Sequence, residues 1–432
     1  QMCIRDRALY GGADLFVVGQ YDDSASVAAV AIGSQVMQTI TGIILGITTG
    51  TTVLIAIATG AKDNRKVAFT IGSSVWLFSI TGVVLTLVMV LFHSRIAELM
   101  HTPVEAMVDT KNYILVCSLG ILFIVGYNVV CGILRGLGDS KTPLYFVGLA
   151  CVINIVLDFI LVGYFHWGAT GAAIATVTAQ GVSFGIALWF LYRHGFHFDF
   201  SRKDIRLNRN LSKKILVLGA PIALQDALIN VSFLIITVIV NQMGVIASAS
   251  LGVVEKIIVF AMLPPMAISS AVATMTAQNY GAGLIKRMNK CLASGIGIAL
   301  VFGVSVCVYS QFLPETLTAF FTKDAAVVAM AADYLRGYSI DCIVVSFVFC
   351  INSYFSGQGN SLFPMIHSLI ATFLFRIPLS YWFSQIDSSS LFIMGFAPPI
   401  STVVSLLICI WYLRYTQRKL YLRGTMMPAM SN

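Results

Sequence analysis

The chain is built almost entirely from long apolar stretches, and this feature constrains its fold more than any other. Most of these stretches exceed the roughly 20 residues that a helix needs to cross a bilayer. Lipid offers no water to backbone polar groups, so stretches of this kind fold as helices. We identify twelve, with approximate bounds 8–21, 25–59, 67–92, 108–134, 143–165, 168–193, 212–241, 245–279, 288–312, 329–354, 362–383 and 390–414. The sequence therefore predicts an all-α polytopic membrane protein. No loop is long enough to form a domain, so the function must lie within the helices.

Composition excludes several other classes of protein. Charged residues make up 11% of the chain and hydrophobic residues 58%. A soluble domain carries about 25% charged residues, so a soluble enzyme, a disordered chain and a nucleic-acid binder are all excluded. The nine cysteines show no CxxC spacing, and the six histidines include no HxH or HExxH pattern. We therefore expect neither a disulfide framework nor a metal site.

Basic residues are distributed unevenly between the two sets of loops. The loops on one side carry only Arg95, Lys111 and Lys323. The loops after even-numbered stretches, together with the tail, carry nineteen: Lys62, Arg65, Lys66, Arg135, Lys141, Arg193, Arg202, Lys203, Arg206, Arg209, Lys213, Lys214, Lys286, Arg287, Lys290, Arg414, Arg418, Lys419 and Arg423. Basic loops stay in the cytoplasm, so both termini and the central loop near 194–211 are predicted to be cytoplasmic.

The N-terminus departs from this pattern. Residues 1–7 (QMCIRDR) are charged and differ in character from the apolar stretch after them, so we interpret them as non-native sequence. The first apolar stretch begins at Ala8 and meets Asp22 and Asp23 after only 14 residues. That is too short for a complete span, so we expect a first helix that has lost its start.

The two halves of the sequence repeat one another at an offset of 221 residues. Gly60-Ala61 falls on Gly281-Ala282, and LRGLGDSKTP at 134–143 falls on FSGQGNSLFP at 355–364. Six spans per repeat is an even number, so both halves share one orientation. Their pseudo-two-fold axis is then predicted to run along the membrane normal.

This repeat predicts the domain organisation. We expect six-helix lobes at 8–200 and 212–415, a cytoplasmic linker at 201–211 and a cytoplasmic tail at 416–432. Two such lobes around a central cleft are typical of an alternating-access transporter. The alternative is a duplicated scaffold without a transport role.

Two acids lie deep in the spans of the N-terminal half, Asp14 and Asp158, with no basic residue in mid-span to neutralise them. Ionisable residues at membrane depth are costly and are functional candidates. At 1.5 Å per residue, both acids lie roughly 12 Å below the outer face. Asn154 is one turn from Asp158 on the same helix face, and Thr176 lies at the same depth. Two carboxylates, an amide and a hydroxyl are predicted to converge.

This set of side chains suits a monovalent cation. Its oxygens can surround a sodium ion. It can equally hold a proton, since burial and a nearby like charge favour the neutral form of a carboxyl group. The alternative is that each acid only forms a hydrogen bond to a neighbouring helix. We expect no cofactor beyond the coupling ion, sodium or proton.

The C-terminal half combines acids and bases at mid-span: Asp226, Glu255, Lys256, Asp341 and Arg376. These residues could pair with one another and be structural. Alternatively, Glu255 or Asp341 meets a cationic substrate or serves as another coupling site, with Asp226 as a third choice and Arg376 beside them.

A proline pair, Pro264-Pro265, interrupts the eighth stretch. Proline removes backbone donors, so the pair is predicted to kink this helix. The kink is either a hinge or a packing bend.

Several motifs, in this order and spacing, resemble the MATE (multidrug and toxic compound extrusion) family over residues 8–415. They are ADLFVVG at 13–19, LRGLGDSKTP at 134–143, NIVLDFILVG at 154–163, GATGAAIATVTAQ at 168–180, GAPIALQ at 219–225, AQNYGAG at 277–283 and RIPL at 376–379. The resemblance implies a secondary antiporter, not an enzyme, that expels organic and often cationic compounds in exchange for sodium ions or protons.

The resemblance also implies site residues. In several members the ion site uses an Asp on helix one, an Asn and an Asp one turn apart on helix five, and a Thr on helix six. Here Asp14, Asn154, Asp158 and Thr176 match those positions. Other members couple through acids of the C-terminal lobe, where Glu255 is a counterpart, so the coupling lobe is left open.

We accordingly expect a monomer in the cytoplasmic (inner) membrane of a prokaryote, with small organic molecules and lipid as partners and no nucleic acid. Three alternatives differ in mechanism. A flippase for a lipid-linked oligosaccharide would need a basic central cavity. A passive channel would show no saturable, ion-driven flux. A membrane-embedded enzyme would need a catalytic motif, which the sequence does not show.

Overall fold

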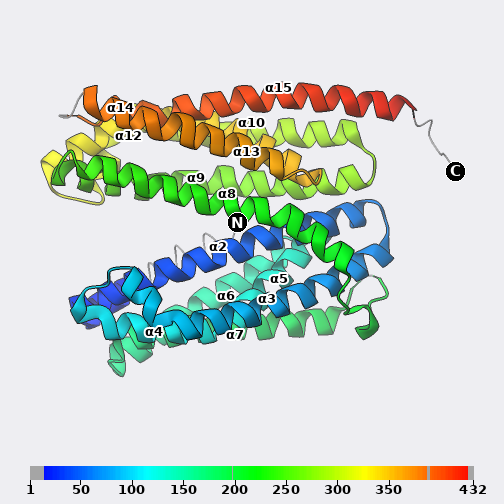
Figure 1. Cartoon of the computed structure of the whole chain (residues 1–432), viewed down its shortest axis with the longest axis horizontal. Coiled ribbons are helices and arrows are strands. Elements are labelled where there is room, and N and C mark those ends of the chain that lie inside the picture. Colours follow the sequence, from blue (N-terminus) through cyan, green and yellow to red (C-terminus); the bar gives the residue numbers. More distant parts are fainter. Residues whose placement is uncertain (1–13, 197, 387–389, 427–432) are drawn as a thin grey trace. The chain divides into compact units, whose positions relative to one another are not determined.

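The computed structural model describes residues 14–196, 198–386 and 390–426, and these contain no β-strand (Figure 1). Residues 14–21 are helical. The later elements are α2 (Ser24–Gly60), α3 (Asn64–Leu99), η1 (Val104–Ala106), α4 (Met107–Leu119), α5 (Ile121–Leu137), α6 (Lys141–Asp158), η2 (Phe159–Tyr164), α7 (Gly168–His194), η3 (Arg202–Asp204), α8 (Arg209–Asn241), α9 (Val245–Gly281), α10 (Ile285–Phe312), α11 (Pro314–Ala319), α12 (Ala325–Gly357), α13 (Leu362–Ile370), η4 (Ala371–Arg376), α14 (Ile377–Ile386), η5 (Met394–Phe396) and α15 (Ala397–Met426). Of the short elements, η2 and η4 are π-helices and the others are 3₁₀-helices.

The predicted fold class, an all-α polytopic membrane protein, is confirmed. Among the described residues, ten helices are long and apolar enough to cross a membrane, and the bent pair Val104–Leu119 and Ile121–Leu137 makes an eleventh. The predicted first span is described only over its helical part at 14–21. The predictions for residues 1–7 and for the start of that span lie outside the described residues.

Acidic caps fix where several helices begin. The carboxylate of Asp23 accepts from the backbone N–H of Ser26 at 2.9 Å, and that of Asp63 accepts from Lys66 at 2.9 Å. Asp324 caps α12 in the same way. Such a cap satisfies a backbone donor that the first helical turn leaves free. The polar breaks between apolar stretches therefore set the helix starts.

The sequence repeat is visible in the helix positions. α2 and α9 begin at Ser24 and Val245, α3 and α10 at Asn64 and Ile285, and α6 and α13 at Lys141 and Leu362, each pair 221 residues apart. Gly138 (φ 101°) and Gly359 (φ 86°) are also 221 apart, and both adopt the left-handed conformation that favours glycine. The two halves thus share one pattern of helices.

The chain divides into two compact units, one up to Ala223 and the other from Leu224. The first therefore extends past the predicted lobe end at residue 200 and includes the first half of α8. The reason is a close helix crossing: a Cβ atom at Gly46 of α2 would lie only 2.6 Å from Ala223, and Gly50 packs against Gly219. Small residues allow such approaches between membrane helices.

The segment before α8 is also held by the first unit. The indole Nε1 of Trp76, on α3, donates to the carbonyl of Ile205 at 2.9 Å. A side chain at Gly72 would collide with the carbonyl of Asp204. The predicted linker at 201–211 is therefore docked along α3.

One element differs from the sequence predictions. The fourth span, predicted to be continuous over 108–134, breaks at Gly120 with a bend of 48°. α9 runs as one helix through Pro264 and Pro265, and the kink at this pair stays a prediction. Neighbouring helices can satisfy the carbonyls that proline leaves without donors. The hinge role of this pair stays a prediction.

Candidate functional site

The four predicted N-terminal residues come from three segments of the first unit. Asp14 lies in the helical segment 14–21 and is 1% exposed. Asn154 and Asp158 lie one turn apart on α6, and both are fully buried. Thr176, on α7, is half-buried. The structure therefore brings together residues separated by up to 162 positions in the sequence.

Hydrogen bonds join three of these four side chains. The Asn154 amide Nδ2 donates to Asp14 Oδ1 at 3.2 Å and to Thr176 Oγ1 at 3.2 Å. The Thr176 hydroxyl donates to Asp14 Oδ2 at 3.0 Å. Each carboxylate oxygen of Asp14 thus accepts one neutral donor, and Asp14 forms no ion pair with any described Lys or Arg.

Three buried oxygens beside this network have no donor. They are Asn154 Oδ1 and both carboxylate oxygens of Asp158. The carboxyl group of Asp158 lies close to that of Asp14, but neither of its oxygens forms a hydrogen bond. Buried acceptors are normally satisfied, and an unsatisfied one costs about 1–3 kcal/mol. Buried acceptor oxygens without a donor are suited to bind a cation or a proton.

The backbone changes character directly after Asp158. The α-helix ends at this residue and continues as the π-helix η2. Turns of this kind are rare and occur frequently at functional sites. Phe159 of η2 makes an edge-to-face contact with Tyr21, at a centroid distance of 6.2 Å. The segment 14–21 is therefore held against the end of α6.

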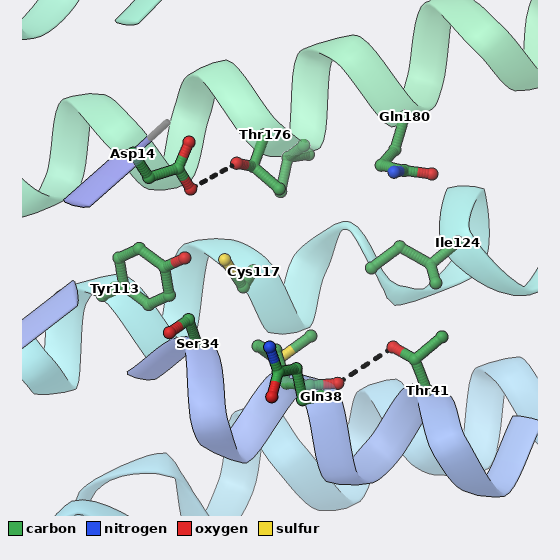
Figure 2. Close-up of a pocket in the computed structure, with 11 residues that line it drawn as sticks. Asp14, Ser34, Gln38, Thr41, Tyr113, Cys117, Ile124, Thr176 and Gln180 are labelled. Atoms are coloured by element: carbon green, nitrogen blue, oxygen red, sulfur yellow. Dashed lines mark hydrogen bonds between the residues drawn. The ribbon is translucent and has the colours of Figure 1, made fainter. Parts of the chain in front are cut away.

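A small cavity of about 60 Å³ adjoins Asp14. Figure 2 shows Asp14, Tyr113 and Thr176 gathered at one end, and Thr41, Ile124 and Gln180 at the other. About 15 Å³ suffices for one water, so the cavity has room for a few waters or a partly hydrated ion. Typical pockets for organic ligands measure about 300–1,000 Å³, so this cavity does not admit a drug-sized molecule.

The sequence analysis did not single out the other polar residues of this cavity. Ser34, Gln38 and Thr41 share one face of α2, and Gln180 lies one turn after Thr176 on α7. The sequence signal that could have identified them is their helical spacing. Uncharged polar residues are common in membrane spans, however, and this spacing alone did not distinguish them from residues without a role in the site.

Among the described residues, the candidates Glu255, Asp341 and Arg376 of the second unit form no ion pairs. Asp341 is 4% exposed, and its Oδ1 has no hydrogen-bond partner. Glu255 is half-buried, and its Oε1 also has none. The guanidinium carbon of Arg376 lies 4.5 Å from the centre of the Phe233 ring. The described structure therefore shows no ion pair among these residues, although such pairing was one of the two predicted alternatives.

Two further C-terminal candidates, Asp226 on α8 and Lys256 on α9, have exposed side chains. Tyr334 and Tyr338, one turn apart on α12, are 3% exposed and lie within the electrostatic influence of Arg376. The sequence analysis did not identify these two tyrosines, because buried aromatic residues are common in helix cores.

Comparisons with known proteins agree with this architecture. A model of the MatE family matches residues 7–160 and 221–382, which is most of the chain. The probable multidrug resistance protein YpnP of Bacillus subtilis is 28% identical over 372 residues, covering 86% of this chain and 83% of its own length. The probable multidrug resistance protein NorM of Thermotoga maritima is 27% identical over 384 residues, covering 86% of this chain and 81% of its own.

Solved structures show the same fold. A multidrug resistance MATE family transporter of the MOP superfamily, in an outward-facing conformation, superposes with a TM-score of 0.91. It is 23% identical and covers 97% of this chain and 94% of its own. Together with the helical repeat and the family match over both halves, this shows that the chain belongs to the MatE family of membrane transporters and is not an enzyme.

Proposed function

We propose that the protein is a secondary active antiporter that exports organic, often cationic, compounds in exchange for sodium ions or protons. The observation that carries the proposal is the buried cluster of Asp14, Asn154, Asp158 and Thr176. It contains two carboxyl groups, three acceptor oxygens without donors and no basic partner among the described residues. The names of the relatives, which are multidrug resistance proteins, support export of drug-like compounds.

The charge of the cluster explains why it would exchange a cation. Two carboxylates about 4 Å apart repel one another by roughly 4 kcal/mol at an effective dielectric constant of 20. A bound sodium ion or proton removes that repulsion. For sodium, the ligands would be oxygens of Asp14, Asn154, Asp158 and Thr176. Loss of the cation would weaken the tie between segment 14–21 and α6, and thereby favour another conformation of the lobe.

The same charge disfavours the flippase alternative at this site. The cavity lining contains Asp14 and no Lys or Arg. A pyrophosphate group would need basic partners.

We propose further that the protein is a monomer in a prokaryotic cytoplasmic membrane. The nineteen basic residues of the loops and tail support an orientation with both termini in the cytoplasm. Two acids of the second unit, Glu255 and Asp341, are proposed to contact the substrate, with Arg376 near them and Asp226 as a third candidate. Their unpartnered oxygens support this role.

Efflux from proteoliposomes tests the function. The vesicles are loaded with a fluorescent organic cation, and a sodium gradient and a pH gradient are imposed separately. We expect saturable efflux driven by one of the two gradients, which would also identify the coupling ion. If folded protein gives efflux at a rate that does not depend on either gradient, the result would contradict antiport.

A further inference from the structure

The cavity beside Asp14 extends away from the site in one direction. From Ser34 to Thr41 on α2 it extends over seven residue steps, or about 10 Å at 1.5 Å per residue. On α7 it reaches from Thr176 to Gln180, and in the fourth span from Tyr113 on α4 past Gly120 to Ile124 on α5. In each of these spans the cavity runs in the same chain direction (Figure 2).

The opposite side of Asp14 is packed with apolar side chains. Val17 and Val18, one turn after Asp14, are 1% and 0% exposed, and Val162, one turn after Asp158, is 0% exposed. Ala169 and Ala172, one to two turns before Thr176, are 1% and 0% exposed. These residues belong to one hydrophobic cluster. Polar groups lie only beyond these residues, where Ser26 donates to Asp109 at 3.3 Å. Among the apolar side chains themselves a desolvated ion would find no polar partner, and burying it there would be very costly.

The walls of the cavity, in contrast, offer polar groups at regular intervals. Ser34, Gln38 and Thr41 supply oxygens along α2, and Gln180 supplies an amide on α7. Ile124, at the far end, is apolar and 7% exposed. It lies just beyond the break at Gly120, where a Cβ atom would come within 2.6 Å of Val177. The far end of the cavity thus combines a polar edge with one apolar side chain beside a bend.

We propose that the coupling cation reaches and leaves Asp14 through this cavity, along Gln180 and Thr41 and past Ile124. It does not pass through the apolar side of Asp14, which contains Val17 and Val162. The proposal rests on the proposed function in that Asp14 is taken to bind the coupling cation. In this account Gln180 and Thr41 are positioning residues for the passing ion, and Ile124 restricts the passage. They affect the rate of exchange more than the affinity at equilibrium.

Cys117 provides a reporter inside the cavity. It lines the cavity between its two ends and is 2% exposed. Silver ion, a monovalent cation, reacts with a thiol by replacing its proton, so that an S–Ag bond forms and one H⁺ is released. The probe is therefore Ag⁺, in nitrate buffer, applied to full-length protein in nanodiscs. The protein keeps Cys117 as its single cysteine, with Cys3, Cys131, Cys151, Cys291, Cys307, Cys342, Cys350 and Cys409 changed to Ala. Thiol remaining after unfolding is measured against time.

The expected rates depend on which side of Asp14 each variant alters. Gln180→Leu should slow the reaction about tenfold, because a passing ion and its water lose one polar partner in the wall of the cavity. Ile124→Ala should speed it at least threefold. Val162→Ala opens the opposite side and should leave the rate unchanged, as should Leu122→Ala, a change on α5 at a residue that is 42% exposed. The same protein with Cys117→Ser gives the background.

A faster reaction in Val162→Ala, with no effect of Gln180→Leu or Ile124→Ala, would overturn the proposal. An unfolded variant is recognised because, without denaturant, its thiol reacts as fast as that of the denatured parent. Ile124→Ala and Gln180→Leu act in opposite directions, so general loosening cannot produce both results. The silver rates do not depend on coupling. The proposed function fails separately, if gradient-driven efflux survives Asp158→Asn.

Discussion

At the scale of single residues, the two lobes differ in whether a basic residue lies near their buried acids. Asp14 and Asp158 have no basic partner among the described residues, whereas the second unit places Arg376 near Glu255 and Asp341. At the repeat offset of 221, Asp14, Asn154 and Asp158 fall on Ile235, Phe375 and Leu379. The duplicated scaffold therefore carries two chemically different sets of side chains. This difference is the reason we assign the coupling ion to the first lobe.

Thr176 offers the most conservative test of that assignment. Thr176→Val keeps the shape of the side chain but removes the hydroxyl that donates to Asp14 and accepts from Asn154. A hydrogen bond to a charged group contributes about 1.5–3 kcal/mol, so the half-saturating concentration of the coupling cation should rise by at least tenfold. Cation-dependent efflux measures this. Thr178→Val, an exposed position on the same helix, is the matched control and should change nothing. Equal affinities in all three proteins would remove Thr176 from the site.

The sequence predicted part of this site for a clear physical reason. Charged residues are rare at membrane depth, so Asp14 and Asp158 stand out, and helix periodicity adds Asn154. The cavity residues Ser34, Gln38 and Tyr113 were not predicted, because nothing in their chemistry separates them from polar residues that only bond their own helix. Thr48 and Thr49, which donate to carbonyls one turn earlier, are examples of the latter. Ser34 also donates to a carbonyl of its own helix, so only the packing of α2, α4, α5 and α7 around the cavity distinguishes the two groups.

At the scale of secondary-structure elements, close helix approach within the first unit depends on glycine. A Cβ atom at Gly132 of α5 would collide with the methyl group of Thr48 on α2. The Thr52 hydroxyl also donates to the carbonyl of Gly132 at 3.0 Å. Contacts of this kind hold membrane helices together where the hydrophobic effect contributes little. The α2–α5 interface is therefore expected to be sensitive to added volume.

Gly132→Ala tests this interface. Overpacking costs about 1–3 kcal/mol, so the variant should melt at a lower temperature than the parent in detergent. The matched control is Gly148→Ala, at an exposed position where a Cβ atom meets nothing within 4 Å. The control should melt at the parental temperature or slightly above it, since alanine favours helix. A Gly132→Ala protein as stable as the control would contradict the packing described here.

The segment 201–211, which is docked on α3, gives a second prediction at this scale. Trp76→Phe removes the hydrogen bond to Ile205, which is worth about 1 kcal/mol. Local opening should then become roughly fivefold more frequent. Trypsin cleavage at the exposed Lys203 and Arg206 should accelerate by a similar factor, while Trp189→Phe, on the exposed face of α7, should not change it. Unaltered cleavage in Trp76→Phe would show that the segment is not held by Trp76.

Element boundaries show what the sequence could and could not predict. Apolar length and the polar breaks between stretches predicted most helices to within a few residues, because lipid and capping chemistry set those limits. The break at Gly120 was not predicted, since one glycine in an apolar stretch does not by itself end a helix. That break depends on neighbouring helices, which a single stretch of sequence does not describe.

At the scale of the whole molecule, the distribution of basic residues predicts its orientation in the membrane. Lys290 and Lys323 are both exposed, and the charge pattern assigns them to opposite sides of the membrane. In a protein without its native cysteines, Lys290→Cys should react with a membrane-impermeant maleimide only in inverted vesicles. Lys323→Cys should react in intact spheroplasts. The reverse pattern would contradict the orientation, and with it the assignment of the exported direction.

The central claim is that the cluster around Asp14 and Asp158 couples cation entry to export. Gradient-driven efflux by Asp158→Asn, compared with the parent in proteoliposomes, tests it most directly, with substrate binding measured on the same preparation to show that the protein is folded. Asparagine keeps the size of the side chain but carries no charge to exchange. We predict that substrate binding persists and that efflux no longer responds to either gradient. Gradient-driven efflux at the parental rate would contradict the account.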